Sequence, residues 1–302
     1  MPFDTATACL AACLVLATAA APASETCPPV EKFAPGVIST DNWEWRLTFT
    51  PTRLRAYWST SVGWWPGTRE RAEIRTSHWL PGGWTQPVVA SFSGLHADMD
   101  PFVSPDGLTL YFSSMRPVDG QEKADMDLWM VRRTWSGWGE PVHVAGASVD
   151  GYDELYPSID VMGNLYFARV KAPVPTEDVD IWRSKRRFDG SFAPAEKLGA
   201  EINTPQRWEF NPEVSPDGRT LLFVRLDRPD DGLPDLGHGW GDLYASRKGP
   251  RGFREGENLG PCVNSAADEF HPTVLWERGT LFFARDAGVP SDFYRTRLSL
   301  PR

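Results

Sequence analysis

The chain has 302 residues, of which 41% are hydrophobic and 14 are tryptophan, and its formal net charge is −9. A chain of this length and apolar content buries a substantial core, which excludes intrinsic disorder. The acidic balance excludes a protein that coats nucleic acid. The 26 glycines and 27 prolines are spread along the chain, as the dense turns of an all-β repeat protein require.

The N-terminus has the features of a secretory signal peptide. An apolar stretch from Ala6 to Ala21 is followed by the small residues of Ala21-Pro22-Ala23, which predicts cleavage after residue 23 and export to the periplasm or beyond. No Lys or Arg precedes the apolar stretch, and Leu10-Ala11-Ala12-Cys13 leaves lipidation open as an alternative. The stretch is shorter than the roughly 20 residues of a spanning helix, so we expect no transmembrane span.

Cleavage after Ala23 would leave Cys27 and Cys262 in an oxidising compartment. Two such cysteines either form a disulfide or stay separate thiols, and the sequence leaves both open. Neither lies near a histidine in a metal-ligand spacing, so no zinc site is predicted.

A hairpin signature runs from Glu209 to Phe223. An alternating apolar segment leads into Ser215-Pro216-Asp217-Gly218 and then into a second apolar run, which predicts two antiparallel strands joined by a tight turn. Asp217 is expected to bond its own backbone, and Gly218 to adopt a positive φ.

Four further copies of this signature occur along the chain. They begin at Glu44, Asp98, Glu154 and Glu269, with anchor residues 54 to 60 apart. Each copy is followed by a strand that begins with an acid, and all but the last copy have an outer strand after Gly-Trp, Gly-Phe or Gly-Ser-Phe. The period therefore predicts four-stranded units repeated around an axis.

The two chain ends complement each other. Residues 31–43 align with 196–208, the last segment of an internal repeat, whereas the last repeat stops after Asp292-Phe293-Tyr294 without its outer strand. We therefore predict an all-β fold, a five-bladed β-propeller of four-stranded blades closed by an N-terminal strand that completes the last blade. The propeller forms a single domain over 24–302, with repeats near 44–97, 98–153, 154–208, 209–268, and 269–302 plus 31–43.

The motifs at Pro101–Phe112 and Pro212–Phe223, with Asp180-Ile181-Trp182, resemble the WD-repeat-like propeller repeat of the TolB type. The resemblance covers essentially the whole mature chain. It implies the propeller fold and leaves the activity open, because relatives range from periplasmic envelope proteins to enzyme-associated domains. The α/β domain that precedes the TolB propeller has no counterpart between Ala23 and Glu44.

Charge is expected to divide between the two faces of such a propeller. The first and third strands of a meander start on one face, which collects the acids; the turns between the first and second and between the third and fourth strands lie on the other face. That second face collects cations, namely Arg132, Arg133, Lys185, Arg186, Arg187, Arg247, Lys248, Arg251 and Arg254.

An acid starts every first strand: Glu44, Asp98, Glu154, Glu209 and Glu269. Converging carboxylates at a channel mouth could bind a cation or act as acid and base in glycoside hydrolysis. A feature that recurs in all five repeats is more simply architectural, with each carboxylate accepting bonds from an adjoining turn.

Function is expected where equivalent positions differ, because a site has no fivefold symmetry. Two residues after each acid stand five different side chains, on the same face as the acids if strand alternation holds: Arg46, Asp100, Tyr156, Asn211 and His271. We predict a ligand site there. Four tryptophans do not recur between repeats and could stack on sugars: Trp64, Trp65, Trp79 and Trp240. We add Trp240 to the predicted ligand site because it lies in the insertion 227–241, and such loops often carry binding specificity.

Two functional hypotheses follow. The first is an exported, non-catalytic, TolB-like module that binds an envelope protein or glycan as a monomer. The second is a glycan-active hydrolase or lyase whose catalytic residues are Asp100, Glu154, Glu269 and His271. No metal or other cofactor is predicted. Calcium binding remains an alternative at Asp125-x-Asp127 and Asp178-x-Asp180, although both motifs lack the full set of ligand positions of an EF-hand loop.

Overall fold

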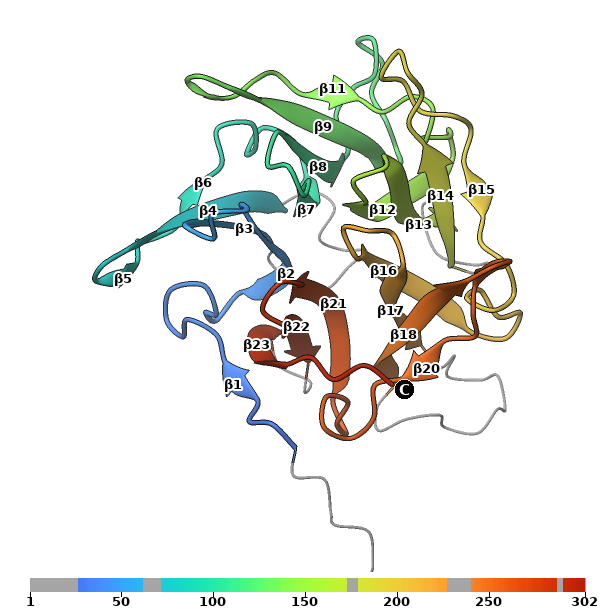
Figure 1. Cartoon of the computed structure of the whole chain (residues 1–302). Helices are drawn as coiled ribbons and strands as arrows, with labels where there is room; N and C mark the ends of the chain where they lie inside the picture. Colours follow the sequence, from blue (N-terminus) through green and yellow to red (C-terminus); the bar gives the residue numbers. More distant parts are fainter. Residues whose placement is uncertain (1–26, 62–71, 173–178, 227–239, 287–289, 302) are drawn as a thin grey trace, which may run out of the picture.

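The computed structural model describes residues 27–61, 72–172, 179–226, 240–286 and 290–301. Its described residues form five antiparallel sheets, and these are the blades of a five-bladed β-propeller. Figure 1 shows the blades following one another around a common centre in sequence order. Among these residues, no helix is long and apolar enough to cross a membrane.

The first strand of each blade lies innermost. These strands are β2 (Trp43–Phe49), β7 (Asp98–Val103), β12 (Tyr152–Ile159), β16 (Trp208–Val214) and β21 (Asp268–Leu275). The second strands pair with them and are almost fully buried. They are β3 (Arg55–Ser61), β8 (Thr109–Ser114), β13 (Asn164–Lys171), β17 (Thr220–Leu226) and β22 (Thr280–Asp286).

The third strands begin on the same face as the first strands. They are β4 (Glu73–Leu80), β9 (Asp127–Thr134), β14 (Asp180–Lys185), β18 (Gly241–Gly249) and β23 (Asp292–Arg297). The outer strand of each blade is short, and in three blades two separate short strands pair with the third strand. In the first four blades, the outer strands are β5 (Gly83–Trp84), β6 (Val88–Val89), β10 (Gly137–Trp138), β11 (Val142–His143), β15 (Glu196–Lys197), β19 (Gly252–Phe253) and β20 (Glu257–Asn258). Blades 1 to 5 are named here by their first strands β2, β7, β12, β16 and β21.

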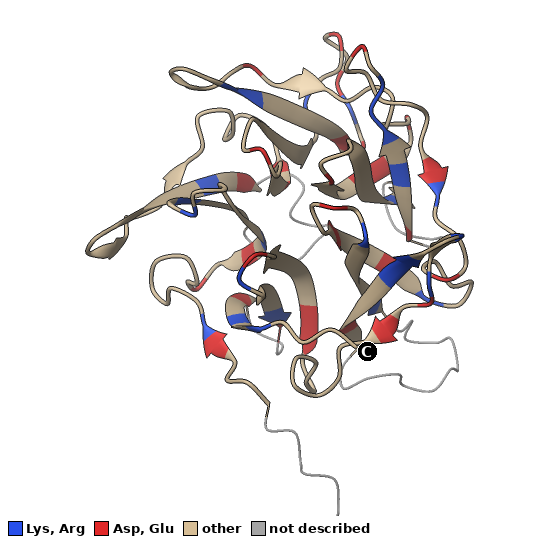
Figure 2. Cartoon of the chain, viewed as in Figure 1, with Lys and Arg blue, Asp and Glu red and all other residues tan. Residues whose placement is uncertain are grey.

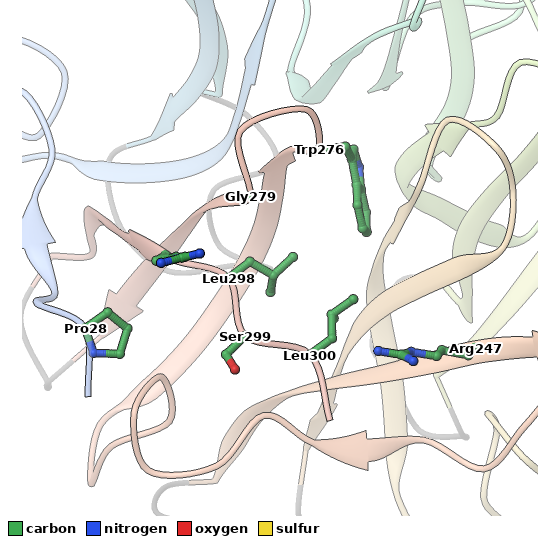
Figure 3. A pocket seen from close by; sticks show the side chains of 8 residues that line it. Pro28, Arg247, Trp276, Gly279, Leu298, Ser299 and Leu300 are labelled. Carbon is green, nitrogen blue, oxygen red and sulfur yellow. The ribbon is translucent and has the colours of Figure 1, made fainter. Parts of the chain in front are cut away.

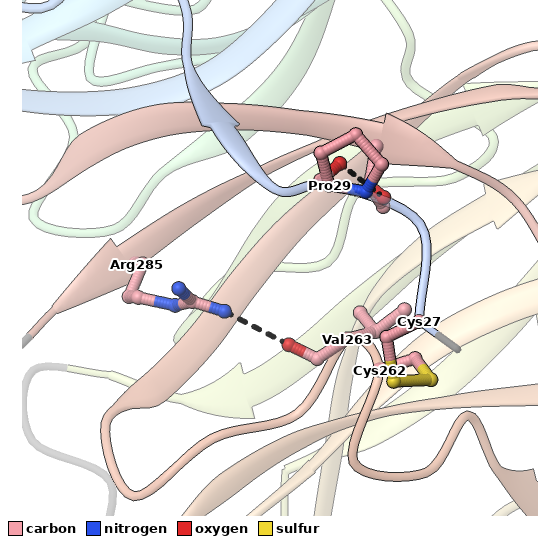
Figure 4. Close-up of a disulfide and its surroundings, with 6 residues drawn as sticks. Cys27, Pro29, Cys262, Val263 and Arg285 are labelled. Carbon is pink, nitrogen blue, oxygen red and sulfur yellow. Dashed lines mark hydrogen bonds between the residues drawn. A yellow bond between two sulfur atoms is a disulfide. The ribbon is translucent and has the colours of Figure 1, made fainter. Parts of the chain in front are cut away.

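The last blade is closed by the N-terminus, as predicted. Strand β1 (Glu31–Lys32) pairs antiparallel with β23, and the amide of Phe33 donates to the carbonyl of Phe293 at 2.7 Å. A disulfide joins Cys27, just before β1, to Cys262, in the segment that leads into β21 (Figure 4). Both chain ends are thereby fixed in one sheet.

The tight turns have the predicted chemistry. The hydroxyl of Ser215 donates to the Asp217 carboxylate at 2.6 Å, and that carboxylate accepts the amide of Arg219 at 3.1 Å. Gly218 has a φ of 67°. The same bonds recur around Asp106 in blade 2. These turns mark one end of the propeller, which we call the turn face; the opposite end, where first and third strands begin, is the strand-start face.

Candidate ligand site at the propeller axis

One residue in each innermost strand interrupts the strand. The pairing register shifts at the same point in all five blades, which places a β-bulge there. The bulged residues have positive φ values, which are 43° for Arg46, 56° for Asp100, 59° for Tyr156, 49° for Asn211 and 51° for His271. Left-handed backbone is uncommon outside glycine, and a bulge redirects a side chain away from the sheet faces.

These five side chains come together from five separate blades. The rings of Tyr156 and His271 lie 5.3 Å apart, and the amide of His271 donates to the Asn211 side-chain oxygen at 2.9 Å. The Arg46 charge acts on the pKa of both Asp100 and His271, and Asp100 acts on that of Tyr156. Tyr156 is half-buried, whereas the other four are fully buried. They therefore cluster at the propeller axis.

The alternation assumed from the sequence does not hold across these residues. The bulge removes each of them from the face that its preceding acid occupies, because two residues of the innermost strand oppose one on its partner. The five differing side chains consequently meet at the axis, apart from the acids that precede them.

Arg46 is held by an ion pair with Glu213. One guanidinium nitrogen donates to Glu213 Oε2 at 2.8 Å and another to the carbonyl of Pro212 at 3.2 Å, while the guanidinium lies 5.4 Å from the ring of Phe102. Burial raises the pKa of Glu213 to about 7, and Arg46 opposes this rise. Glu213 was missed in the sequence, although the equivalent residues of the other copies are Thr48, Phe102, Ser158 and Thr273, so a lone acid at this position was the available signal.

Asp100 is the residue whose polar atoms are least satisfied. Its side chain is completely buried, and neither carboxylate oxygen has a hydrogen-bond partner of standard geometry among the described residues. Burial raises the pKa of Asp100 to about 7, against the opposing influence of Arg46 and the Tyr156 amide. Unfilled acceptors, a shifted pKa and a left-handed backbone in one residue are typical of a functional site.

His271 is held in its neutral form. Burial, reinforced by the Arg46 charge, lowers the pKa of His271 well below its usual value. Its Nδ1 is buried without a hydrogen-bond partner in the part of the chain that the structure describes. A neutral imidazole can donate or accept a hydrogen bond to a ligand, but it does not carry a positive charge near pH 7.

An arc of aromatic rings runs around the axis on the strand-start side. Trp43 stacks on Trp45 with centroids 5.6 Å apart, and Trp45 meets the edge of His271 at 5.6 Å. Beyond His271, the contacts continue through Tyr156 to Phe210 at 5.9 Å. Trp43, Tyr156 and Phe210 are partly exposed. In the sequence, Trp43, Trp45 and Phe210 have the pattern of ordinary strand residues and give no separate signal.

The acids that start the first strands are engaged within their own blades. Arginines donate at 2.7 Å to Glu154, at 2.8 Å to Glu209 and at 2.7 Å to Glu269, and the same arginines also bond loop carbonyls. These are Arg169, Arg225 and Arg285, and Arg116 serves Asp98 in the same way. Of the four residues in the catalytic hypothesis, Asp100 and His271 reach the axis, whereas Glu154 and Glu269 tie strands to loops.

Glu44 differs from the other four acids. Its cross-strand partner is Thr60, where three blades have arginine. Its Oε1 accepts the amide of Thr40 at 3.0 Å, and its buried Oε2 has no hydrogen-bond partner within the described ranges. Burial raises the pKa of Glu44 to about 8, although the bonds from Thr40 oppose the rise.

The remaining candidates lie elsewhere. Trp240 is exposed beside the start of β18, and its amide donates to Asp268 at 2.8 Å; the neighbouring Gly241 packs against Phe270. Trp79 is exposed near the end of β4, where it pairs with Trp84 of β5, away from the axis. Trp64, Trp65 and most of the insertion before Trp240 lie outside the described residues.

The Asp125-x-Asp127 pair faces an ammonium group. Lys123 Nζ lies 3.3 Å from Asp125 and 3.4 Å from Asp127, and it also pairs with Asp150. Across the residues that the structure describes, no group of three or more metal-ligating side chains is arranged to hold a metal ion. Asp178 of the second pair lies outside those residues.

Family models and curated proteins give no match to this chain. Solved structures do. The endo-arabinase of Bacteroides thetaiotaomicron superposes with a TM-score of 0.52 at 15% identity, covering 88% of this chain and 98% of that one. The β-1,2-mannobiose phosphorylase of Listeria innocua gives 0.54 at 9% identity, covering 89% and 97%.

A puromycin-hydrolyzing peptidase of Mycobacterium tuberculosis gives a TM-score of 0.44 at 12% identity. The match covers 82% of this chain but 35% of the peptidase, so this chain spans about a third of that protein. At these identities the likenesses show the fold alone. The chain is a five-bladed β-propeller with structural neighbours in propeller families.

Proposed function

We propose that this propeller binds a glycan at the strand-start end of its axis, through Arg46, Asp100, Tyr156, Asn211 and His271. Asp100 carries the proposal, because it is a fully buried carboxyl without an ion-pair partner within the described ranges, and burial raises its pKa to about 7 although Arg46 and the Tyr156 amide oppose the rise. Partly exposed aromatic rings beside polar groups suit a sugar, whose C–H faces stack on rings while its hydroxyls form hydrogen bonds.

Two observations support the glycan class. Trp43, Tyr156 and Phe210 present partly exposed rings next to the buried polar group at the axis. Two neighbours with TM-scores above 0.5 are named as an endo-arabinase and a β-1,2-mannobiose phosphorylase. Trp240, exposed on the same face, is proposed to extend the contact surface.

Catalysis is the second candidate, and Asp100 favours it. A carboxyl with a pKa near 7 can exchange a proton at neutral pH, which is what a general acid requires. Glycoside hydrolysis needs a second carboxyl, and Glu213, across Arg46 from Asp100, replaces Glu154 and Glu269 in that role. Within this candidate, Glu213 would have to leave Arg46 or share it with the substrate.

The site of action proposed from the sequence is the cell envelope or outside, in a TolB-like role. The Cys27–Cys262 disulfide supports it, because structural disulfides persist in oxidising compartments. The signal peptide lies outside the described residues and stays a prediction.

Isothermal titration calorimetry tests the proposal by measuring the affinity of the purified protein for glycans. The glycans are arabino-oligosaccharides, β-1,2-mannobiose and bacterial envelope polysaccharides. We expect Trp43→Ala and Asp100→Asn each to weaken binding about tenfold or more. Trp135→Ala and Asp189→Asn are matched controls, because both residues are exposed on turn-face hairpins. Binding that the control variants weaken as much as the axis variants would overturn the proposal.

Reaction products are assayed in the same samples. Release of sugars by the wild type that Asp100→Asn abolishes would select the catalytic candidate. Binding with unchanged glycans would select the binding module.

A further inference from the structure

The turn face exposes large apolar side chains at its hairpin tips in blades 1 to 3. At the inner turns, Leu54, Leu108 and Met162 are 54%, 59% and 77% exposed. At the turns after the third strands, Leu80 is 53% exposed, while Trp135 and Phe188 are fully exposed. Each tip is held by a tight turn, so these side chains project into solvent without packing on a core.

The tips are arranged in one plane by the fold itself. Blades of a closed propeller are related by rotation about the axis, so equivalent hairpins lie at the same height along it. The inner tips form one such set and the outer tips another. Three adjacent blades therefore present a broad apolar edge at one end of the molecule.

The equivalent tips of the other blades carry exposed arginines, next to the exposed acids Asp217 and Glu277 at the inner turns. Arg219 and Arg278 occupy the inner turns of blades 4 and 5, and Arg251 occupies the outer turn of blade 4, all of them exposed. In a chain with a net charge of −9, cations gather at this end, because an acid stands at or next to the start of β9, β14, β18 and β23, and Lys or Arg stands at or near the end of each. Figure 2 shows this on β9, with the acid at one end and basic residues at the other.

Cations also border the apolar tips directly. Arg186 and Arg187 line a groove of about 500 Å³ with Met162 and Phe188. Asp106 lies in the same groove, and exposed Asp189 follows Phe188. Asp189 is engaged by Ser191, whose amide and hydroxyl both donate to it. The tips thus combine an apolar group with adjacent positive charge.

A pocket of about 650 Å³ opens on the basic side of the turn face (Figure 3). Arg247 of blade 4 and Arg297 of blade 5 line it, with Trp276 and the C-terminal Leu298 and Leu300. Two guanidinium groups beside apolar walls match the phosphate and the first acyl carbons of a phospholipid.

We propose that the turn face docks on an anionic phospholipid membrane. Trp135, Phe188 and the neighbouring tips insert into the interface, the surrounding arginines bind phosphate groups, and the pocket between Arg247 and Arg297 takes a headgroup. Exposed Trp and Phe among Lys and Arg are the composition of membrane-surface binding sites. The separation of the apolar groups over three hairpins favours a continuous fluid surface over a protein partner, whose binding energy would centre on one contiguous pocket.

This orientation leaves the strand-start face, with the axis site, directed away from the membrane. The proposal does not depend on the glycan hypothesis, because the two sites lie at opposite ends of the propeller.

The experiment is co-sedimentation of the full chain with vesicles of phosphatidylglycerol and phosphatidylcholine mixtures, and with pure phosphatidylcholine. We expect binding to the anionic vesicles that weakens as salt is raised. The double variant Trp135→Ser with Phe188→Ser should bind about tenfold more weakly or worse, and Arg247→Glu with Arg297→Glu should do the same.

Trp240→Ser is the matched control, since it removes an exposed tryptophan from the opposite face. It should bind vesicles like the wild type, and circular dichroism should show that every variant is folded. An absence of binding to anionic vesicles, equal binding to both vesicle types, or an equal loss in Trp240→Ser would each overturn the proposal.

Discussion

At the scale of single residues, the five acids of the first strands separate into two kinds. Four are neutralised by an arginine that also bonds a loop carbonyl, and one is not. The recurrence of an acid in the sequence indicates architecture for all five, but it does not reveal that Glu44 lacks the arginine. That difference depends on which residue of the second strand lies opposite Glu44. The copy that begins at Glu44 is the most degraded of the five, so its sequence does not show how its first and second strands pair.

Glu44→Gln is expected to stabilise the protein at alkaline pH. The folded-state pKa of Glu44 is raised to about 8. The protonated carboxyl therefore contributes to the stability of the folded state below pH 4.5, and this contribution is lost as pH rises toward 8. The amide cannot ionise, so the variant should gain about 2 kcal/mol relative to wild type at pH 8.5 and little at pH 5. Urea unfolding at the two pH values measures this.

Glu209→Gln serves as the contrasting variant. It removes the carboxylate that faces Arg225 and leaves a buried guanidinium without its ion pair. Burial raises the pKa of Glu209 too, to about 7, although Thr204 and Arg225 oppose the rise, so the contrast lies in the guanidinium. We expect the variant to be destabilised by about 3 kcal/mol at neutral pH because Arg225 stays buried beside an uncharged amide. Equal effects of the two substitutions would show that the arginine does not distinguish these sites.

At the scale of elements, the bulge in each innermost strand is what brings the site together. The sequence predicts the strands, the turns and the positions where equivalent residues differ. It does not predict the bulge, because Arg, Asp, Tyr, Asn and His share no turn chemistry that signals left-handed backbone. Proline after four of the five bulged residues is the only shared local feature, and it is compatible with an ordinary strand edge.

Asn211 allows the bulge to be tested. Asn211→Gly should be nearly neutral, because it relieves a φ of 49° while losing the bond to the His271 amide. Asn211→Val should cost about 2 kcal/mol or more, because a β-branched residue is strained in that conformation and cannot accept the bond. Urea midpoints compare the two. A valine variant as stable as the glycine variant would contradict the bulge.

At the scale of the whole molecule, the ring is closed by very little backbone. Strand β1 contributes two paired residues, and the disulfide at Cys27 adds a covalent link across 235 residues of sequence. The closure is predictable from the matching half-repeats at the chain ends. The disulfide is not, since two cysteines alone do not reveal whether the fold brings them together.

Cys27→Ser should therefore destabilise the whole propeller. A link that closes so long a loop typically contributes about 2 to 5 kcal/mol. Reducing agent should lower the unfolding midpoint of the wild type to that of the variant and leave the variant unchanged. A variant whose midpoint equals that of the oxidised wild type would show that β1 and its contacts close the ring alone.

The central claim is that the residues at the axis serve a ligand and not the fold, and Asp100→Asn tests it most directly. Because the pKa of Asp100 is raised to about 7, its burial is tolerated near pH 4 and becomes unfavourable as pH rises through 7. If the carboxyl is kept for function, urea unfolding should show the Asp100→Asn variant to be more stable than wild type by about 1 to 2 kcal/mol at pH 8, and similar to it at pH 4, where the folded carboxyl is protonated and the unfolded one is only partly ionised. An Asp100→Asn variant that is less stable than wild type at both pH values would show that Asp100 is structural, and would contradict the claim.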